Sequence, residues 1–265
     1  CHVFYLTRVP SPAIIAQAFK DVKPAIVIAV PLVIEKIIRK KVFPQIQNTK
    51  VKLLMKMPGV GKKVKKRICE QVYQAFGGNL YEVIIGGAAL NQEIESFLKD
   101  IDFPFTVGYG ATECAPIITY SDWHDFVPMS CGREVVHMEV KIDSENPETV
   151  PGEILARGLN VMLGYYKNDE ATAQTIDKDG WYHTGDLGLM DKGGNVFIKG
   201  RSKNMLLGPN GQNIYPEEIE DKLNSMTFAM ESVVVQRDGK LVGLVHPDFD
   251  EVLAMGLSRD DLQSL

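Results

Sequence analysis

The sequence predicts an α/β protein: a large parallel-sheet α/β portion, then a small β-rich portion, then the beginning of an α+β portion. Short β-branched runs alternate with helix-like segments as far as Thr119, which is typical of a parallel sheet. Closely spaced strand and turn patterns follow between Glu134 and Lys199. From Arg201 onward, one helix-like segment precedes two strands. We therefore expect three regions, at residues 1–133, 134–200 and 201–265.

The first region alternates strands and helices. Ala25–Val30 is a continuous apolar run, which indicates a strand buried on both faces of a parallel sheet. Asn91 can cap a helix that reaches Asp100. The predicted helices lie at residues 12–22, 32–41 and 91–100, and the predicted strands at 25–30, 81–85 and 105–107.

The later regions carry hairpin signals. Strand patterns at Leu187–Met190 and Val196–Lys199 are joined by the turn-forming sequence Asp191-Lys192-Gly193-Gly194-Asn195. Pro216 stands where a helix through Leu223 begins, a position that tolerates proline. Two further strands, at 232–236 and 241–246, turn at Asp238-Gly239, and Ser258 can cap one more helix.

Composition and charge exclude several classes of protein. The 265 residues are 45% hydrophobic and 24% charged, as in globular proteins, which excludes a disordered or coiled-coil chain. The formal charge of −5 argues against a nucleic-acid binder, whose affinity rests on neutralising phosphates. The longest apolar run, Ala25–Ile34, is too short to span a membrane, and no signal-peptide pattern is present. The cysteines form no C-x-x-C pair, so we expect a reducing compartment, the cytoplasm.

Basic residues are concentrated in the segment Lys36–Arg67. It contains twelve lysines or arginines and no acidic residue, whereas the rest of the chain has 17 basic and 34 acidic residues. Such a segment is either a solvated helical excursion or a surface for an anionic partner. Val60, Val64 and Ile68 interleave with the lysines, as in a helix at a membrane interface. The second interpretation predicts that residues 36–67 attach peripherally to the inner face of an anionic membrane.

Two predicted strand ends carry residues suited to nucleotide chemistry. Ligands of open α/β sheets bind beyond the carboxyl ends of the strands, and here these ends are Gly86-Gly87-Ala88-Ala89 and Gly108-Tyr109-Gly110-Ala111-Thr112-Glu113. Tyr109 offers a ring face to a base, Thr112 a hydroxyl to phosphate, and Glu113 a hard oxygen ligand to Mg²⁺. Taken alone, G-x-G-x-x-E also fits a simple tight turn.

A second candidate cluster is W-Y-H-T-G-D at residues 181–186. Asp186 follows a turn, so it can either accept hydrogen bonds from two ribose hydroxyls or simply cap that turn. Arg201 is either a contact to a phosphate or ribose oxygen or a plain surface cation. His183 has no G-x-S-x-G nucleophile elbow to serve, and Gly59-Val60-Gly61-Lys62 departs from the P-loop pattern.

Read in order, these motifs resemble those of the adenylate-forming enzymes, which include acyl-CoA synthetases, firefly luciferase and the adenylation domains of peptide synthetases. The motifs are G-G-A-A-L, G-Y-G-A-T-E, P-G-E-I-L-A-R-G, G-Y-Y-K-N-D-E-A-T, W-Y-H-T-G-D-L-G, G-R-S-K-N and P-E-E-I-E. The resemblance runs from about Val9 to Glu220. The stretch Lys23–Lys36 and the basic residues after it are most similar to long-chain fatty acyl-CoA synthetases.

The resemblance implies a role for each matching position. It implies that Thr112 and Glu113 are catalytic, with Thr112 touching the α-phosphate and Glu113 binding Mg²⁺. Tyr109 would stack on adenine, and Asp186 would bind the ribose hydroxyls with help from Arg201. The nucleotide-binding positions implied are Gly86, Gly87, Ala88, Tyr109, Gly110, Thr112, Asp186 and Arg201.

The last region would contain the moving parts. Lys203 falls at the hinge position of the family, between the large adenylation domain that the first two regions form and the mobile C-terminal domain. Asn204 departs from the Asp or Glu that is frequent there, which leaves the hinge hydrogen bonds open. Gly211 would lie near the CoA channel.

The implied chemistry uses ATP, Mg²⁺, CoA and a fatty acid. A fatty carboxylate attacks the α-phosphorus of ATP to give acyl-AMP and pyrophosphate, and CoA then displaces AMP. The family's phosphate loop would precede Cys1 and its adenylation lysine would follow Leu265, so we expect an internal piece of a longer polypeptide that is inactive alone. Two alternatives stay open: transfer of the acyl group to a carrier protein, and a catalytically idle nucleotide-binding module. Nothing in the sequence indicates the oligomeric state.

Overall fold

The alternating strands and helices near the start of the chain build a parallel sheet. In the computed structural model, β1 (Ile26–Ala29), β2 (Glu82–Ile85) and β3 (Phe105–Val107) pair in parallel, in that order. The register places Val27 beside Val83 and Val83 beside Phe105. Together with the antiparallel sheets described below, this confirms the predicted mixed α/β fold class.

The structure describes residues 2–7, 12–46, 53–55, 57–208, 211–226, 228–256 and 258. Its chain divides into two units. Unit 1 comprises residues 1–139, 158–162 and 193–196, and unit 2 comprises residues 140–157, 163–192 and 197–265. The domain limits expected at residues 133 and 200 stay predictions. The helix predicted from Ser258 falls almost wholly outside the described residues.

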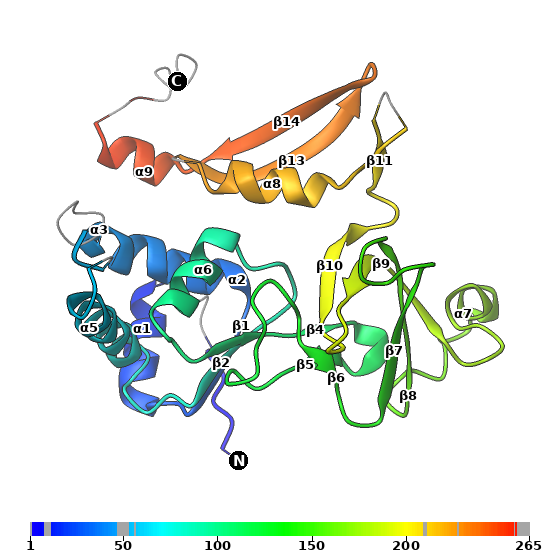
Figure 1. Ribbon diagram of the computed structural model, residues 1–265, viewed down its shortest axis with the longest axis horizontal. Coiled ribbons are helices and arrows are strands. Elements are labelled where there is room, and N and C mark those ends of the chain that lie inside the picture. The colour runs from blue at the N-terminus through cyan, green and yellow to red at the C-terminus, as the bar shows by residue number, and fades with distance from the viewer. Residues whose placement is uncertain are drawn as a thin grey trace. The chain divides into compact units, whose positions relative to one another are not determined.

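Helices of unit 1 lie beside the parallel sheet (Figure 1). They are α1 (Pro12–Val22), α2 (Pro31–Ile37), α3 (Phe43–Ile46), α5 (Val60–Ala75) and α6 (Gln92–Asp100). The bounds of α1 are those predicted. The Asn91 cap is also confirmed, because its side-chain oxygen accepts hydrogen bonds from the backbone N–H groups of Glu93 (3.1 Å) and Ile94 (3.3 Å).

Two predictions about these elements are wrong in detail. The first strand is not buried on both faces: Val27 is 8% exposed, whereas Ile26 is 54% and Ile28 is 79% exposed. Successive side chains of a strand point to opposite faces, and in the described part of the chain only one face of this edge strand is covered. The helix predicted to end at residue 41 instead widens into one π-helical turn, η1 (Ile38–Val42), and continues as α3.

Helix α5, which contains the last five basic residues of the segment Lys36–Arg67, is anchored in the protein. Ile68 and Val72 of α5 are 6% and 1% exposed, and Val64 is half-buried. The expectation that these apolar residues face a membrane is therefore wrong for Ile68, which is buried in unit 1, whereas Val64 is only partly covered. The core of this unit contains stacked aromatic rings, with ring centroids of Phe19 and Phe76 5.0 Å apart.

The strands after β3 are antiparallel. In unit 1, β4 (Tyr109–Gly110), β5 (Ile117–Tyr120) and β6 (Arg133–Glu134) form a small sheet after the 3₁₀ turn η2 (Thr112–Cys114). A four-stranded sheet has the order β10-β9-β8-β7. Its strands are β7 (Met138–Asp143), β8 (Gly152–Gly158), β9 (Tyr182–Met190) and β10 (Val196–Arg201), with α7 (Asp169–Thr175) between β8 and β9. The β9–β10 pair confirms the hairpin predicted around Asp191–Asn195.

The last region is a short α+β arrangement, as predicted. Helix α8 (Pro216–Asn224) runs alongside the long hairpin of β13 (Ala229–Arg237) and β14 (Lys240–Pro247) (Figure 1). The Glu220 carboxylate of α8 accepts a hydrogen bond from the Val234 N–H at 2.7 Å, which ties the helix to the hairpin. The elements are β11 (Leu206–Leu207), β12 (Asn213–Ile214), α8 (Pro216–Asn224), β13 (Ala229–Arg237), β14 (Lys240–Pro247) and α9 (Phe249–Ala254). Across the described residues, no helix has the length and apolar character that a bilayer span requires.

Candidate functional site

In unit 1, the two glycine-rich strand ends lie side by side. The Gly86 N–H donates to the Ala29 carbonyl at 3.2 Å, and the Gly108 N–H donates to the Ile85 carbonyl at 2.9 Å. A Cβ atom at Gly86 would stand 3.4 Å from the Gly108 oxygen. Gly87 and Ala88 follow directly and are exposed. The structure therefore brings the Gly86–Ala88 and Gly108–Gly110 segments together at the carboxyl edge of the sheet.

Any residue larger than glycine at position 110 would clash with the backbone. A Cβ atom there would lie 2.1 Å from the Pro116 carbonyl oxygen, far inside van der Waals contact. The chain doubles back at this point, and the Ala111 N–H donates to the same oxygen at 2.8 Å. Tyr109, just before it, is only 8% exposed. Little of its ring is therefore open to a base in this conformation, and the stacking role stays a prediction.

The turn η2 carries the two residues expected to be catalytic. Thr112 is exposed and Glu113 is half-buried, while Cys114 is fully buried. Burial, assisted by the neighbouring Glu113 charge, raises the pKa of the Cys114 thiol to about 11. The thiol is therefore protonated at neutral pH and is a packing group rather than a nucleophile.

Residues from a distant segment hold this turn, and the sequence analysis missed them. The Asn160 amide donates to the carbonyl oxygens of Cys114 (2.6 Å) and Ile117 (2.9 Å). The Met162 N–H donates to the Glu113 carbonyl at 2.7 Å. The only sequence signal was that Asn160 and Met162 stand two and four positions after the end of the P-G-E-I-L-A-R-G motif.

The donor set around η2 fits one kind of metal ion. Within the described residues, no group of three or more His, Cys, Asp or Glu side chains could hold a metal. Mg²⁺ bound with a nucleotide needs only one or two carboxylates, because phosphates and waters complete its shell. A single carboxylate at Glu113 is compatible with such an ion and incompatible with a metal centre built by protein alone.

In unit 2, the structure brings Asp186 and Arg201 together. Asp186 on β9 is 8% exposed, and its Oδ1 lies 3.1 Å from Nε of Arg201 at the end of β10. The Thr184 hydroxyl accepts from the Asp186 N–H at 3.0 Å and donates to the Ile154 carbonyl at 2.7 Å. The carboxylate is thus held at a fixed place, with a cation beside it.

A carboxylate that the sequence analysis overlooked supports the same turn. Glu153 on β8 accepts from the Gly185 N–H at 2.9 Å, and its other oxygen lies 2.9 Å from Nδ1 of His183. Nε2 of His183 is 3.8 Å from Asp177. Hydrogen bonds from the Trp181 and Asp179 backbone N–H groups, with help from His183 and Lys141, lower the pKa of Asp177. His183 therefore belongs to a structural network.

The predicted hinge is tied to the first turn of α8. Glu217 accepts from the side-chain amide of Asn204 at 3.0 Å and lies 3.4 Å from the Arg201 N–H. Asn204 therefore has a defined partner, which answers the question that its departure from Asp or Glu raised. Lys203 is exposed within this turn, and Gly211 is exposed with a φ of +74° in the β11–β12 hairpin. Their hinge and CoA-channel roles stay predictions.

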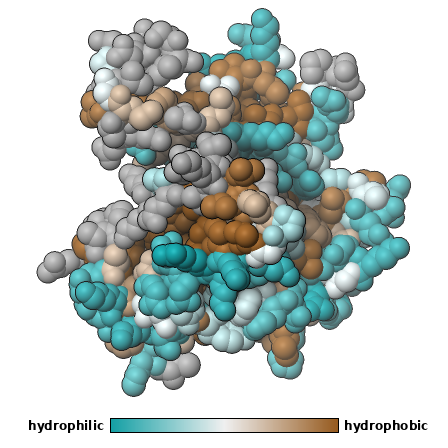
Figure 2. Space-filling model, turned by 60° about the vertical axis from the view of Figure 1, so that its left-hand side comes forward, coloured by the Kyte–Doolittle hydropathy of each residue, from teal (hydrophilic) through white to brown (hydrophobic). Residues whose placement is uncertain are grey.

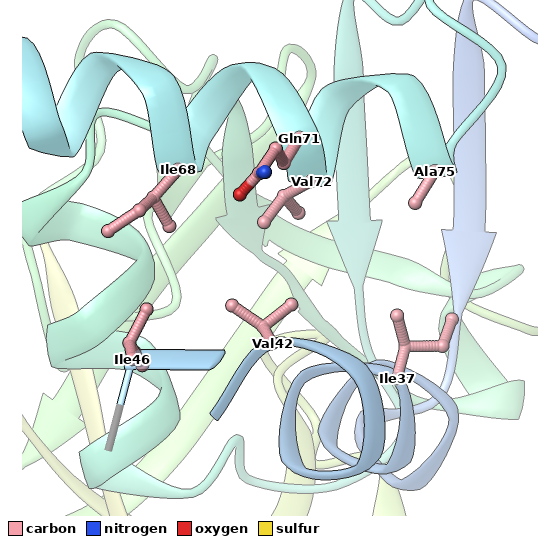
Figure 3. Close-up of a pocket in the computed structure, with 7 residues that line it drawn as sticks. All are labelled: Ile37, Val42, Ile46, Ile68, Gln71, Val72 and Ala75. Carbon is pink, nitrogen blue, oxygen red and sulfur yellow. The ribbon is translucent and has the colours of Figure 1, made fainter. Parts of the chain in front are cut away.

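Unit 1 also contains an apolar cavity of about 160 Å³ between α5 and the α2–η1–α3 segment. Figure 3 shows Ile68, Gln71 and Val72 of α5 facing Ile37, Val42 and Ile46. Ala75 completes the lining, and Gln71 is its one polar side chain. No residue predicted for nucleotide binding lines this cavity.

Comparisons with known proteins agree with this arrangement. A long-chain-fatty-acid–CoA ligase, ACSBG2 of Rattus norvegicus, is 30% identical over 251 residues, covering 86% of this chain but only 36% of the ligase. 4-Coumarate–CoA ligase 1 of Glycine max is 38% identical over 173 residues, covering 60% of this chain and 58% of that protein.

Structural similarity extends over nearly the whole chain. The O-succinylbenzoate coenzyme A synthetase of Bacillus subtilis, solved in complex with ATP and magnesium ion, matches with a TM-score of 0.66 at 21% identity, over 90% of this chain and 45% of that one. The family model described as AMP-binding enzyme matches residues 1–166. The chain therefore belongs to the AMP-binding enzyme family, whose members form adenylates.

Proposed function

We propose that this protein acts in the ATP-dependent activation of a fatty acid to its CoA thioester. In the first half-reaction the fatty carboxylate attacks the α-phosphorus of ATP, giving acyl-AMP and pyrophosphate. In the second, the CoA thiolate displaces AMP. The observation that carries the proposal is the match to a long-chain-fatty-acid–CoA ligase over 86% of the chain.

The residues of the chain would divide the work between binding and charge stabilisation. Negative charge grows on phosphate oxygens during adenylate formation, and an ion at Glu113 would neutralise it. The Thr112 hydroxyl is exposed on the same turn and can donate to a phosphate oxygen. Asp186 would accept hydrogen bonds from the ribose hydroxyls, and Arg201 beside this buried carboxylate would hold it in place.

A second substrate class has support of its own. The 4-coumarate–CoA ligase of Glycine max is 38% identical, a higher identity than the fatty-acid ligase of Rattus norvegicus has, although over a shorter stretch. An aromatic carboxylate is therefore the competing acyl substrate. Pyrophosphate exchange into ATP by the complete product of the gene, with palmitate and with 4-coumarate, separates the two.

Nucleotide titration of the 265-residue chain, followed by NMR, tests the binding role directly. We expect weak binding of AMP and ATP, because the family's phosphate loop is not among these residues. 2′-Deoxy-AMP should bind roughly 10- to 150-fold more weakly than AMP, since one hydrogen bond to a charged carboxylate contributes about 1.5–3 kcal/mol. Asp186→Asn should weaken AMP binding and abolish the preference for the 2′-hydroxyl.

Matched variants separate a specific role from a general loss of charge. Asp179→Asn removes the same charge from an exposed position in unit 2. This variant should change neither the affinity for AMP nor the affinity for 2′-deoxy-AMP. Glu113→Gln should remove the Mg²⁺ dependence of ATP binding while AMP binding stays unchanged. Unaltered ribose selectivity in Asp186→Asn, or submicromolar binding of ATP by the wild-type chain, would contradict the proposal.

A further inference from the structure

Helix α5 presents a row of cations to solvent. Lys62, Lys63, Lys66 and Arg67 are exposed, whereas Ile68 and Val72 on the opposite side are buried. The fifth cation, Lys65, pairs with Asp100 at 2.5 Å. None of the four exposed cations forms an ion pair with another residue that the structure describes. Glu70, one turn after Lys66, is the nearest acid on the same helix.

Apolar side chains are exposed beside the start of this helix. Leu53 is 64%, Leu54 38%, Met57 44% and Val60 42% exposed. Side chains of this kind are normally buried, so four of them exposed within eight residues indicate an interaction surface.

The apolar segment is packed tightly onto α5. The Gly61 N–H donates to the Met57 carbonyl at 2.8 Å, and a Cβ atom at Gly61 would stand 2.3 Å from the Met55 oxygen. Val60, Lys63 and Arg67 have the i, i+3, i+7 spacing of one helix face. The exposed apolar residues are therefore held next to the cations. Figure 2 views the side of the molecule that carries α5, where hydrophilic and hydrophobic surfaces adjoin.

We propose that these eight residues form a docking surface for an anionic phospholipid bilayer. The α5 surface, as we call it, comprises Leu53, Leu54, Met57, Val60, Lys62, Lys63, Lys66 and Arg67. Its cations face the negative lipid headgroups, and its apolar side chains enter the interfacial layer. The anchoring of Ile68 and Val72 in the core means that α5 lies on the membrane through its cationic face and its N-terminal end.

Exposed apolar area favours a bilayer over a nucleic acid. The segment Lys36–Arg67 has no acidic residue and would attract either polyanion, so the apolar side chains beside the cations decide between them. Exposed leucine and methionine add nothing to phosphate binding but gain free energy when they leave water for the acyl boundary. The inference goes beyond the proposed function, because none of these residues is assigned to the nucleotide.

Co-sedimentation of the 265-residue chain with lipid vesicles tests the surface. We expect binding to phosphatidylcholine vesicles that contain phosphatidylglycerol, no binding to pure phosphatidylcholine, and a loss of binding as salt rises. Replacing Lys62, Lys63, Lys66 and Arg67 with Gln should lower the association constant by roughly two to three orders of magnitude, at about 1 kcal/mol per cation. Leu53→Asn with Met57→Gln should weaken binding about tenfold or more without changing its salt dependence.

A control variant separates the α5 surface from net charge. Replacing Lys20, Lys178, Lys192 and Lys240 with Gln removes four exposed cations elsewhere and should leave vesicle binding unchanged. Circular dichroism melts check that both quadruple variants are folded. Equal loss of binding in the two variants, binding to pure phosphatidylcholine, or binding to duplex DNA without binding to vesicles would each overturn the proposal.

Discussion

The two groups of predicted nucleotide residues are built in different ways. In unit 1, the turn after β3 depends on the absence of a side chain, because Gly110 lies where a Cβ would stand 2.1 Å from the Pro116 oxygen. In unit 2, the turn before Asp186 depends on the presence of one, because Glu153 accepts from the Gly185 N–H at 2.9 Å. The first turn requires a close steric fit at Gly110 in addition to the Asn160 hydrogen bonds, whereas a carboxylate positions the second turn.

This difference predicts how each turn fails. A steric fit allows no partial substitute, so any added atom must displace the backbone of the neighbouring strand. The hydrogen bonds of a carboxylate can be removed in steps, because an amide side chain keeps one acceptor oxygen while alanine keeps none. Substitution at Gly110 in unit 1 should therefore cause a large loss of stability at once. Substitutions at Glu153 in unit 2 should cause losses that increase with the number of hydrogen bonds removed.

The largest effect is expected at Gly110. Gly110→Ala should lower the free energy of unfolding by about 3 kcal/mol, because the added methyl forces β4 and β5 apart. Urea unfolding followed by circular dichroism measures the loss. Gly239→Ala is the matched control: its φ of +73° makes alanine strained, but nothing lies within 4 Å, so a loss of about 1 kcal/mol is expected. Similar losses in both variants would show that close approach is not what requires Gly110.

An intermediate, graded effect is expected at Glu153. Glu153→Ala should cost about 2 kcal/mol, because the Gly185 N–H and His183 lose their acceptor. Glu153→Gln keeps one carbonyl oxygen and should cost about half as much. AMP binding should weaken in the same order if Glu153 positions the turn that carries Asp186.

The control for Glu153 is Glu148→Ala, at an exposed position of the same unit. It should change the free energy of unfolding by less than about 0.5 kcal/mol. Equal losses for Gln and Ala would contradict the graded response.

The parts of this protein that the sequence predicted are those that local pattern determines. The cap at Asn91 uses N–H groups two and three residues later, and the β9–β10 turn lies within five residues. Both interactions are visible in a short window of sequence.

The supporting residues could not be predicted in this way, because their partners are distant in the chain. Asn160 reaches Cys114 across 46 residues, and Glu153 reaches Gly185 across 32. No local period marks such contacts. The exposure of Ile26 and Ile28 was missed for a related reason: an apolar run does not reveal which faces of its strand are covered.

The smallest loss of stability is expected at the predicted hinge. There, the Glu217 carboxylate makes both a close steric contact and a side-chain hydrogen bond. A Cβ atom at Gly200 would lie 2.5 Å from the Glu217 carboxylate, and the same carboxylate accepts from the Asn204 amide at 3.0 Å. Asn204→Asp should cost about 1 kcal/mol, because a donor becomes a second carboxylate beside the first at an exposed site. The cost should shrink in high salt, where screening reduces the repulsion. Adding Glu217→Gln should rescue the Asn204→Asp variant, since the glutamine amide can donate to the introduced carboxylate, and a double-mutant cycle isolates that coupling. A coupling near zero would mean that the two side chains do not interact in solution, which would contradict the Asn204–Glu217 hydrogen bond as a determinant of this joint.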